Sequence, residues 1–171
     1  ATAVLLLQQD GLLCVDDSVG KFFPGWPYAG MTLRHLLNHR SGLPRYMAVA
    51  SWYWQDPKMP MCNENVVTQY VTHAPTHFFH PGTGFNYNNT NYVLLAEVVA
   101  RVSGMPFGEF LQRRIFEPAG MQHSGLYPLG SEQPPAESVA TGHRRGWRGP
   151  YPAYRDYIDG VVGDKGLYAS A

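Results

Sequence analysis

The chain has 171 residues, of which 44% are hydrophobic and 15% charged, and its 13 basic and 13 acidic residues cancel. This composition is typical of a folded domain and excludes a disordered chain or one whose charge attracts nucleic acid or an anionic membrane. The apolar run at residues 3–7 is far shorter than the roughly 20 residues of a membrane span and lacks the basic segment of a signal peptide.

The first part of the chain predicts short helices separated by turns. Residues 1–10 have the apolar spacing of a helix, and a glycine directly after them marks its end. Residues 12–24 form a connector. Thr32 then offers an N-terminal cap for a helix over residues 33–37, which the Ser-Gly-Leu-Pro sequence at 41–44 terminates.

The middle of the chain predicts a loop followed by further helices. Residues 45–62 are rich in Trp, Tyr, Met and Pro and predict a long loop with room for one helical turn. Asn63 is placed to cap a helix that runs to His73. Apolar residues recur at helical spacing over 90–102, and residues 106–115 predict another short helix.

Beyond residue 117, Gly, Pro and Tyr dominate. Residues 128–136 predict a Pro/Ser/Glu loop, and 138–144 and 165–169 predict short strands. The sequence therefore predicts an α+β domain that is mostly helical, with a few short strands toward the C-terminal end. We expect residues 1–171 to belong to a single domain.

Neither the cysteines nor the histidines predict a redox or metal centre. Cys14 and Cys62 leave a disulfide open, and we favour two buried, unbonded thiols. His35 and His39 have an i, i+4 spacing that zinc sites use, but no glutamate lies between them and no Cys or acidic cluster joins them. We expect these histidines to pack and hydrogen-bond around the turn at 41–44. No cofactor or metal is predicted.

Residues 81–92, with the sequence PGTGFNYNNTNY, form a glycine-rich turn that leads directly into an apolar helix. Tyr87 and Asn89 are two residues apart on this turn, so both side chains can face one cleft. A phenol takes up a proton at neutral pH where a nearby cation favours the phenolate, and an amide both donates and accepts. The alternative is structural: Tyr87 would be an aromatic residue beside a helix start and Asn89 an ordinary N-cap.

Several segments, in order along the chain, resemble the serine β-lactamase and penicillin-binding-protein-like superfamily. Within it they are most similar to the class C-type branch of esterases, D-aminopeptidases and D-Ala-D-Ala carboxypeptidases. The resemblance spans nearly the whole chain and rests on residues 11–19, Phe23-Pro24, 32–44, Pro81-Gly82, 85–89, 102–104, 115–121 and 163–170. One segment alone would be weak, but the ordered set is highly specific.

The resemblance implies the mostly helical portion of a β-lactamase/DD-peptidase-like fold and acyl transfer through a serine intermediate. Tyr87 matches the tyrosine that takes the serine's proton together with a lysine, and Asn89 matches the asparagine that binds substrate. We expect the Ser-x-x-Lys motif upstream of Ala1 and the Lys/His-x-Gly motif downstream of Ala171, so that the chain is a partial domain and inactive alone. The implied partner is a small-molecule or peptide-like ester, β-lactam or D-amino-acid amide.

Two segments match the outer motifs only by spacing. Ser18-Val19-Gly20-Lys21 reads as Ser-x-x-Lys, and His123-Ser124-Gly125 reads as His-x-Gly. Gly20 and the Phe-Phe-Pro sequence that follows oppose the helical turn that would bring the lysine over the serine. We therefore expect that Ser18 is not the nucleophile.

One alternative of a different class stays open at this point. The superfamily includes non-catalytic members that bind peptidoglycan-like or protein ligands. A Ser-x-x-Lys motif upstream of Ala1 would support an enzyme, and its absence would support a binding protein. Many family members are exported, but this chain carries no signal segment, so its localisation stays open.

Overall fold

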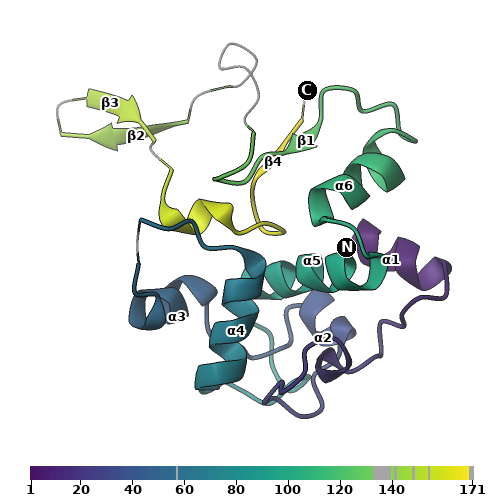
Figure 1. The fold of residues 1–171 in the computed structure, drawn as a ribbon. Helices are drawn as coiled ribbons and strands as arrows, with labels where there is room; N and C mark the ends of the chain where they lie inside the picture. Colours follow the sequence, from purple (N-terminus) through teal and green to yellow (C-terminus); the bar gives the residue numbers. More distant parts are fainter. Residues whose placement is uncertain (57, 133–139, 141, 148, 154, 170–171) are drawn as a thin grey trace.

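The computed structural model describes residues 1–56, 58–132, 140, 142–147, 149–153 and 155–169. Most of the regular structure is helical and the strands are short, which confirms the α+β class (Figure 1). The helices are α1 (Thr2–Gln9), α2 (Leu33–Leu37), α3 (Tyr46–Tyr53), α4 (Asn63–His73), α5 (Thr90–Ser103) and α6 (Phe107–Leu111). The strands are β1 (Gly125–Leu126), β2 (His143–Gly146), β3 (Gly149–Pro152) and β4 (Leu167–Tyr168).

Several predicted helices form within a residue or two of the expected bounds because their end signals act locally. Thr32 caps α2 as predicted: its Oγ1 accepts from the His35 N–H at 3.4 Å, and the His35 Nδ1 accepts from the Thr32 N–H at 3.3 Å. The helix α5 ends at Gly104, whose φ of 67° is the left-handed conformation that glycine adopts without steric cost. The short helix α6 continues as a π-helical turn over Gln112–Phe116.

The predicted loop over residues 45–62 was wrong in its first part, where the eight-residue helix α3 forms. Tyr46, Val49 and Ala50 have at most 1% of their surface exposed. These positions share one helical face, and its burial against the core stabilises the helix. The aromatic-rich composition of the segment did not indicate a helix, because aromatic residues have only moderate helix propensity.

Asn63 does not cap α4, which corrects a second prediction. The N-cap position is Cys62, and the Asn63 side chain reaches across the molecule instead. Its Nδ2 donates to the carbonyl oxygens of Val93 (3.3 Å) and Val162 (3.0 Å), and its Oδ1 accepts from the Val162 N–H at 2.8 Å. The residue therefore ties α4 to α5 and to the C-terminal segment.

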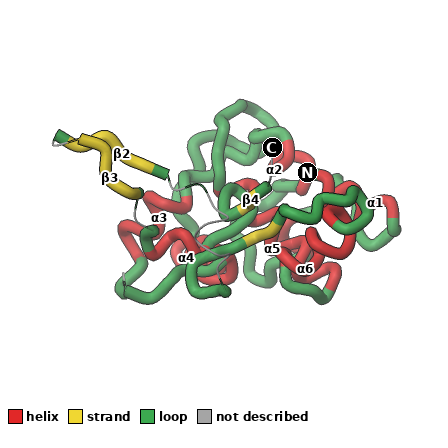
Figure 2. Tube along the Cα trace, turned by 90° about the horizontal axis from the view of Figure 1, so that it is seen from above, coloured by secondary structure: helices red, strands yellow, loops and turns green. Residues whose placement is uncertain are grey.

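The strands form two separate antiparallel pairs in the described part of the chain. The strand β1 pairs with β4, with Gly125 opposite Tyr168. The strands β2 and β3 form a hairpin that extends away from the helices in both views (Figures 1 and 2). The sequence does not predict β1 or β3, because runs this short and rich in glycine and proline carry almost no periodicity.

The predicted strand at 165–169 contains β4, whereas the one at 138–144 overlaps only the start of β2. Residues 138, 139 and 141 of that prediction lie outside the described residues. In the predicted loop at 128–136, residues 128–132 are irregular, and 133–136 also lie outside the described residues.

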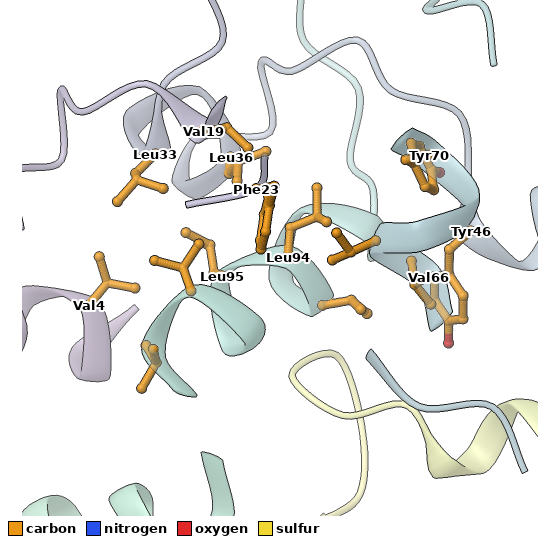
Figure 3. Close-up of a cluster of buried hydrophobic side chains, with 14 of the residues drawn as sticks. Val4, Val19, Phe23, Leu33, Leu36, Tyr46, Val66, Tyr70, Leu94 and Leu95 are labelled. Carbon is orange, nitrogen blue, oxygen red and sulfur yellow. The ribbon is translucent and has the colours of Figure 1, made fainter. Parts of the chain in front are cut away.

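The core is built around α5, which contacts α1, α2, α4 and α6. Figure 3 shows Leu94 and Leu95 of α5 between Val4 of α1 and the Tyr70 side of α4. Leu94 is fully buried and Leu95 has 2% of its surface exposed. Burial of this kind stabilises by roughly 2 kcal/mol per large apolar side chain, so α5 acts as the support for the turn that precedes it.

A C-terminal segment over residues 157–165 closes against the helices. The Met61 N–H donates to the Tyr157 carbonyl at 2.8 Å. Gly163 has a φ of 111°, and a β-carbon there would overlap the carbonyl oxygen of Tyr92 in α5. Only glycine permits this approach, which places Asp164 beside α3 and α5.

Cys14 and Cys62 are free, as favoured, but both are exposed, which corrects the prediction of buried thiols. Cys14 lies in the connector after α1. Cys62 lies at the N-terminus of α4, where its Sγ is 3.0 Å from the Asn65 Oδ1. In the described part of the chain, no helix has the length and hydrophobicity that a bilayer crossing requires.

Candidate active site

Tyr87 and Asn89 lie on the turn before α5 and line one small pocket. Arg45, Tyr46 and Met47 at the start of α3 form its other wall, and its volume is about 130 Å³. The Tyr87 side chain is 63% exposed, and Asn89 is half-buried. The structure therefore brings together the two residues that the sequence singled out.

Asn88, between them, is buried and anchors the turn. Its Nδ2 donates to the carbonyl oxygens of Leu43 (2.6 Å) and Pro44 (3.0 Å), and its Oδ1 accepts from the Thr90 N–H at 3.0 Å. Asn89 occupies the N-cap position of α5, but its side chain makes no capping hydrogen bond. The Asn88 side chain satisfies the first helical N–H instead, which leaves Asn89 free to line the pocket.

His39 lies directly after α2 and supports the same turn. Its ring centroid is 4.5 Å from the ring centroid of Tyr87 and 5.3 Å from that of Tyr92. The His39 Nδ1 accepts from the Asn88 N–H at 3.2 Å, and the His39 carbonyl accepts from the Asn86 N–H at 3.0 Å. Burial lowers the pKa of the His39 imidazole.

Ser41 has 1% of its surface exposed and links the turn at 41–44 to α5. Its Oγ donates to the Asn91 Oδ1 at 2.6 Å and accepts from the Leu43 N–H at 3.3 Å. Thr90 adds a further link, because its Oγ1 accepts from the Tyr46 N–H at 2.8 Å. These bonds join the turn at 41–44 to the start of α5 and fix one pocket wall against the other.

Asp164 contacts the pocket residue Tyr46 and was not predicted as part of the site. The Tyr46 hydroxyl donates to its Oδ2 at 3.1 Å, while its buried Oδ1 has no hydrogen-bond partner among the described residues. Burial raises the pKa of the Asp164 carboxyl, and Lys165, Tyr46 and Asn89 oppose that rise. Burial likewise raises the pKa of the Tyr46 phenol.

The pocket offers a phenol, an amide and a cation, which suits recognition of a polarised carbonyl or a carboxylate. Arg45 is exposed, and no carboxylate of the described chain lies within ion-pair distance of its guanidinium. The lining residues include no serine, threonine or cysteine. A covalent acyl-transfer reaction in this pocket therefore needs a nucleophile from another part of the protein.

The Ser18–Lys21 segment does not have the geometry of a catalytic Ser-x-x-Lys motif. Ser18 caps a 3₁₀ turn over Val19–Lys21, and its side chain accepts from the Gly20 N–H at 3.3 Å. The Lys21 Nζ pairs with Asp17 at 2.7 Å instead of contacting the serine.

His35 and His39, the pair with the spacing of a zinc site, make structural contacts: His35 takes part in the cap of α2, and His39 supports the turn before α5.

We expect Ser18→Ala to leave any hydrolytic activity of the complete protein within about twofold of wild type, because the serine only caps a turn. The lost cap should lower the free energy of unfolding by about 1 kcal/mol at most. Steady-state kinetics and urea unfolding measure both effects. A loss of turnover with the fold retained would assign the nucleophile to Ser18.

The model of the family described as Beta-lactamase matches residues 1–171. The chain belongs to the Beta-lactamase family. Among curated relatives of this family, penicillin-binding protein 4* of Bacillus subtilis is 40% identical over 127 residues, which cover 74% of this chain. Lovastatin esterase of Penicillium rubens is 30% identical over 152 residues, which cover 76% of this chain.

Solved structures show the same fold. A D-amino acid amidase from Ochrobactrum anthropi SV3 superimposes on 99% of this Beta-lactamase-family chain with a TM-score of 0.79 and 28% identity. A penicillin-binding protein from Bacillus halodurans does so over 98%, with a TM-score of 0.77 and 30% identity. The chain covers 47% and 50% of these two proteins, and 28% and 37% of the two curated relatives. The resemblance drawn from the ordered motifs is confirmed.

Proposed function

We propose that residues 1–171 form one wall of the active site of a serine hydrolase of the Beta-lactamase family. The reaction is acyl transfer from an ester, a β-lactam or a D-amino-acid amide to a serine, followed by hydrolysis of the acyl-enzyme. The observation that carries the proposal is the shared pocket of Tyr87 and Asn89 on an internally anchored turn. The names of the relatives, which include a D-aminopeptidase and an esterase, support acyl substrates.

Tyr87 takes the role of proton acceptor in this proposal. The serine oxygen attacks the substrate carbonyl while its proton passes to the Tyr87 oxygen, held as phenolate by the neighbouring lysine. The proton then passes to the leaving group as the acyl-enzyme forms. Water hydrolyses the acyl-enzyme by the same proton transfers in reverse. The exposed phenol on the pocket wall suits this exchange, since it is accessible to both substrate and nucleophile.

Asn89 takes the role of substrate binder. Its amide donates to the acyl side of the substrate and accepts from the lysine, which holds both in register. We further propose that the serine and lysine of the Ser-x-x-Lys motif, and the third motif, lie outside these 171 residues. The absence of a nucleophile among the pocket-lining residues supports this division.

Covalent trapping tests the proposed function. The complete protein is incubated with a fluorescent penicillin and, separately, with a fluorophosphonate, and the labelled peptide is identified by mass spectrometry. We expect a single acylated or phosphonylated serine, followed by lysine three residues later, outside residues 1–171. The isolated 171-residue chain should show no burst with a p-nitrophenyl ester.

Other outcomes would contradict the proposal in different ways. A label on Ser18 or Ser41 would place the nucleophile within the chain. No label with either probe, in a folded protein, would favour a non-catalytic relative that binds peptidoglycan-like or protein ligands.

A further inference from the structure

The Tyr87 phenol has a single recorded ring contact in the described part of the chain, and that contact is His39. The two ring centroids are 4.5 Å apart, with the ring planes tilted by 43°. Tyr87 is 63% exposed, so few other atoms restrict its side chain. Among the described residues, the His39 imidazole is therefore the ring against which the phenol packs.

His39 also holds the backbone on both sides of Tyr87. Its carbonyl accepts from the Asn86 N–H at 3.0 Å, and its Nδ1 accepts from the Asn88 N–H at 3.2 Å. His39 itself has a φ of 56°, a left-handed conformation that is unfavourable for a residue with a β-carbon. Such a conformation persists where the surroundings enforce it, and here these two bonds with the motif do so.

The Asn88 backbone N–H fixes the protonation of the imidazole. A backbone N–H can only donate, and this one donates to the His39 Nδ1 at 3.2 Å, so Nδ1 is an acceptor and the proton of the neutral ring lies on Nε2. The Asn91 Nδ2, which lies 3.2 Å from the same Nδ1, can donate to it as well. The Asn91 Oδ1 on the other side of that amide is 2.6 Å from the Ser41 Oγ.

We propose that His39 is a positioning residue for Tyr87, an inference that rests on the proposed role of Tyr87 in catalysis. The neutral Nε2–H imidazole packs against the Tyr87 ring, and its Nδ1 accepts from the Asn88 N–H in the backbone next to Tyr87. Protonation of Nδ1 would set an N–H against two N–H donors and release the turn. His39 thereby acts on the reaction through the placement of Tyr87, without contact with the substrate.

A double-mutant cycle tests this role in the complete protein. In His39→Asn, the Oδ1 takes the place of the Nδ1 acceptor, and asparagine tolerates the left-handed backbone. The substitution thus keeps the acceptor for the Asn88 N–H and removes the imidazole ring with its contacts to Tyr87 and Tyr92. We expect kcat for a p-nitrophenyl ester to fall roughly tenfold or more, since misplacement of a catalytic group by about 1 Å costs up to about 100-fold. KM should change less than twofold.

The same substitution in a Tyr87→Phe background should have almost no further effect on kcat. Full additivity of the two losses would overturn the proposal, as would wild-type kcat in His39→Asn when Tyr87→Phe is impaired. Wild-type turnover in Tyr87→Phe would instead remove the catalytic role proposed for Tyr87, on which this inference rests. His123→Asn, an exposed histidine outside the pocket, is the matched control and should leave kcat unchanged.

A measurement on the wild-type protein covers the case in which His39→Asn does not fold. The ¹⁵N spectrum of the His39 imidazole at neutral pH should show an unprotonated Nδ1 and a protonated Nε2. Ring-current shifts should link its Cε1 proton to the Tyr87 ring. An Nδ1–H tautomer, or a doubly protonated ring at neutral pH, would overturn the proposal.

Discussion

Tyr87→Phe should reduce kcat/KM for an activated ester about 100-fold or more in the complete protein. The substitution removes only the phenolic oxygen, which accepts the serine's proton in the proposed reaction, and loss of such a group typically costs 10²- to 10⁴-fold. The fold should be unaffected, because the side chain is 63% exposed and its hydroxyl makes no hydrogen bond to the described residues. Stopped-flow acylation kinetics and a melting curve measure the two effects.

Tyr151→Phe is the control for the Tyr87 experiment. Tyr151 lies in β3, on the hairpin away from the helices, and is 42% exposed. Its substitution should change neither kcat/KM nor the melting temperature. An unchanged acylation rate in Tyr87→Phe would contradict the catalytic role of Tyr87 but would not affect the assignment to the family.

Asn88→Ala should lower the free energy of unfolding by about 3 kcal/mol, because it removes three buried hydrogen bonds. The Leu43 carbonyl and the Thr90 N–H lose their bonds to the Asn88 side chain, whereas the Pro44 carbonyl loses one of three donors and keeps Tyr70 and Thr90. Turnover should fall as well, since the anchored residue lies between Tyr87 and Asn89. Urea unfolding of the complete protein, monitored by fluorescence, gives the change.

Asn88→Asp separates hydrogen bonding from shape. It has nearly the same volume but places a carboxylate against two carbonyl oxygens, so it should be at least as destabilising as Asn88→Ala. Asn38→Ala, at an exposed position, should change the unfolding free energy by less than about 0.5 kcal/mol. A stable Asn88→Ala variant with wild-type turnover would show that the turn holds its shape by other means.

Local signals were sufficient to predict much of the helical architecture. The helices α1, α2 and α5 carry apolar spacing, a cap or a terminating glycine within their own residues, so short windows of sequence identify them. The helix α3 was not predicted, because what stabilises it is the burial of one of its faces against the core, and that contact exists only in the folded protein. The strand β1 depends on its distant partner β4, whereas β3 pairs with the neighbouring β2 and is rich in glycine and proline.

The residues of the site also differ in whether a local sequence signal identifies them. Tyr87 and Asn89 could be found because they form a recognisable pattern two residues apart. Asn88, His39 and Asp164 could not, since their roles come from partners 44 or more positions away along the chain. No propensity or spacing rule reports such contacts, and only the folded arrangement of the turn, α2 and the C-terminal segment creates them.

The approach of Gly163 to the Tyr92 carbonyl has a consequence for how such proteins diversify. Main-chain atoms meet there directly, so a β-carbon at position 163 would push the C-terminal segment away from α5. Arg45 and Met47 are exposed, so their side chains can be exchanged without disturbing this contact. Related proteins can therefore differ in the side chains that line the pocket while the backbone contact at Gly163 is kept. We expect position 163 to be glycine in relatives in which positions 45 and 47 differ.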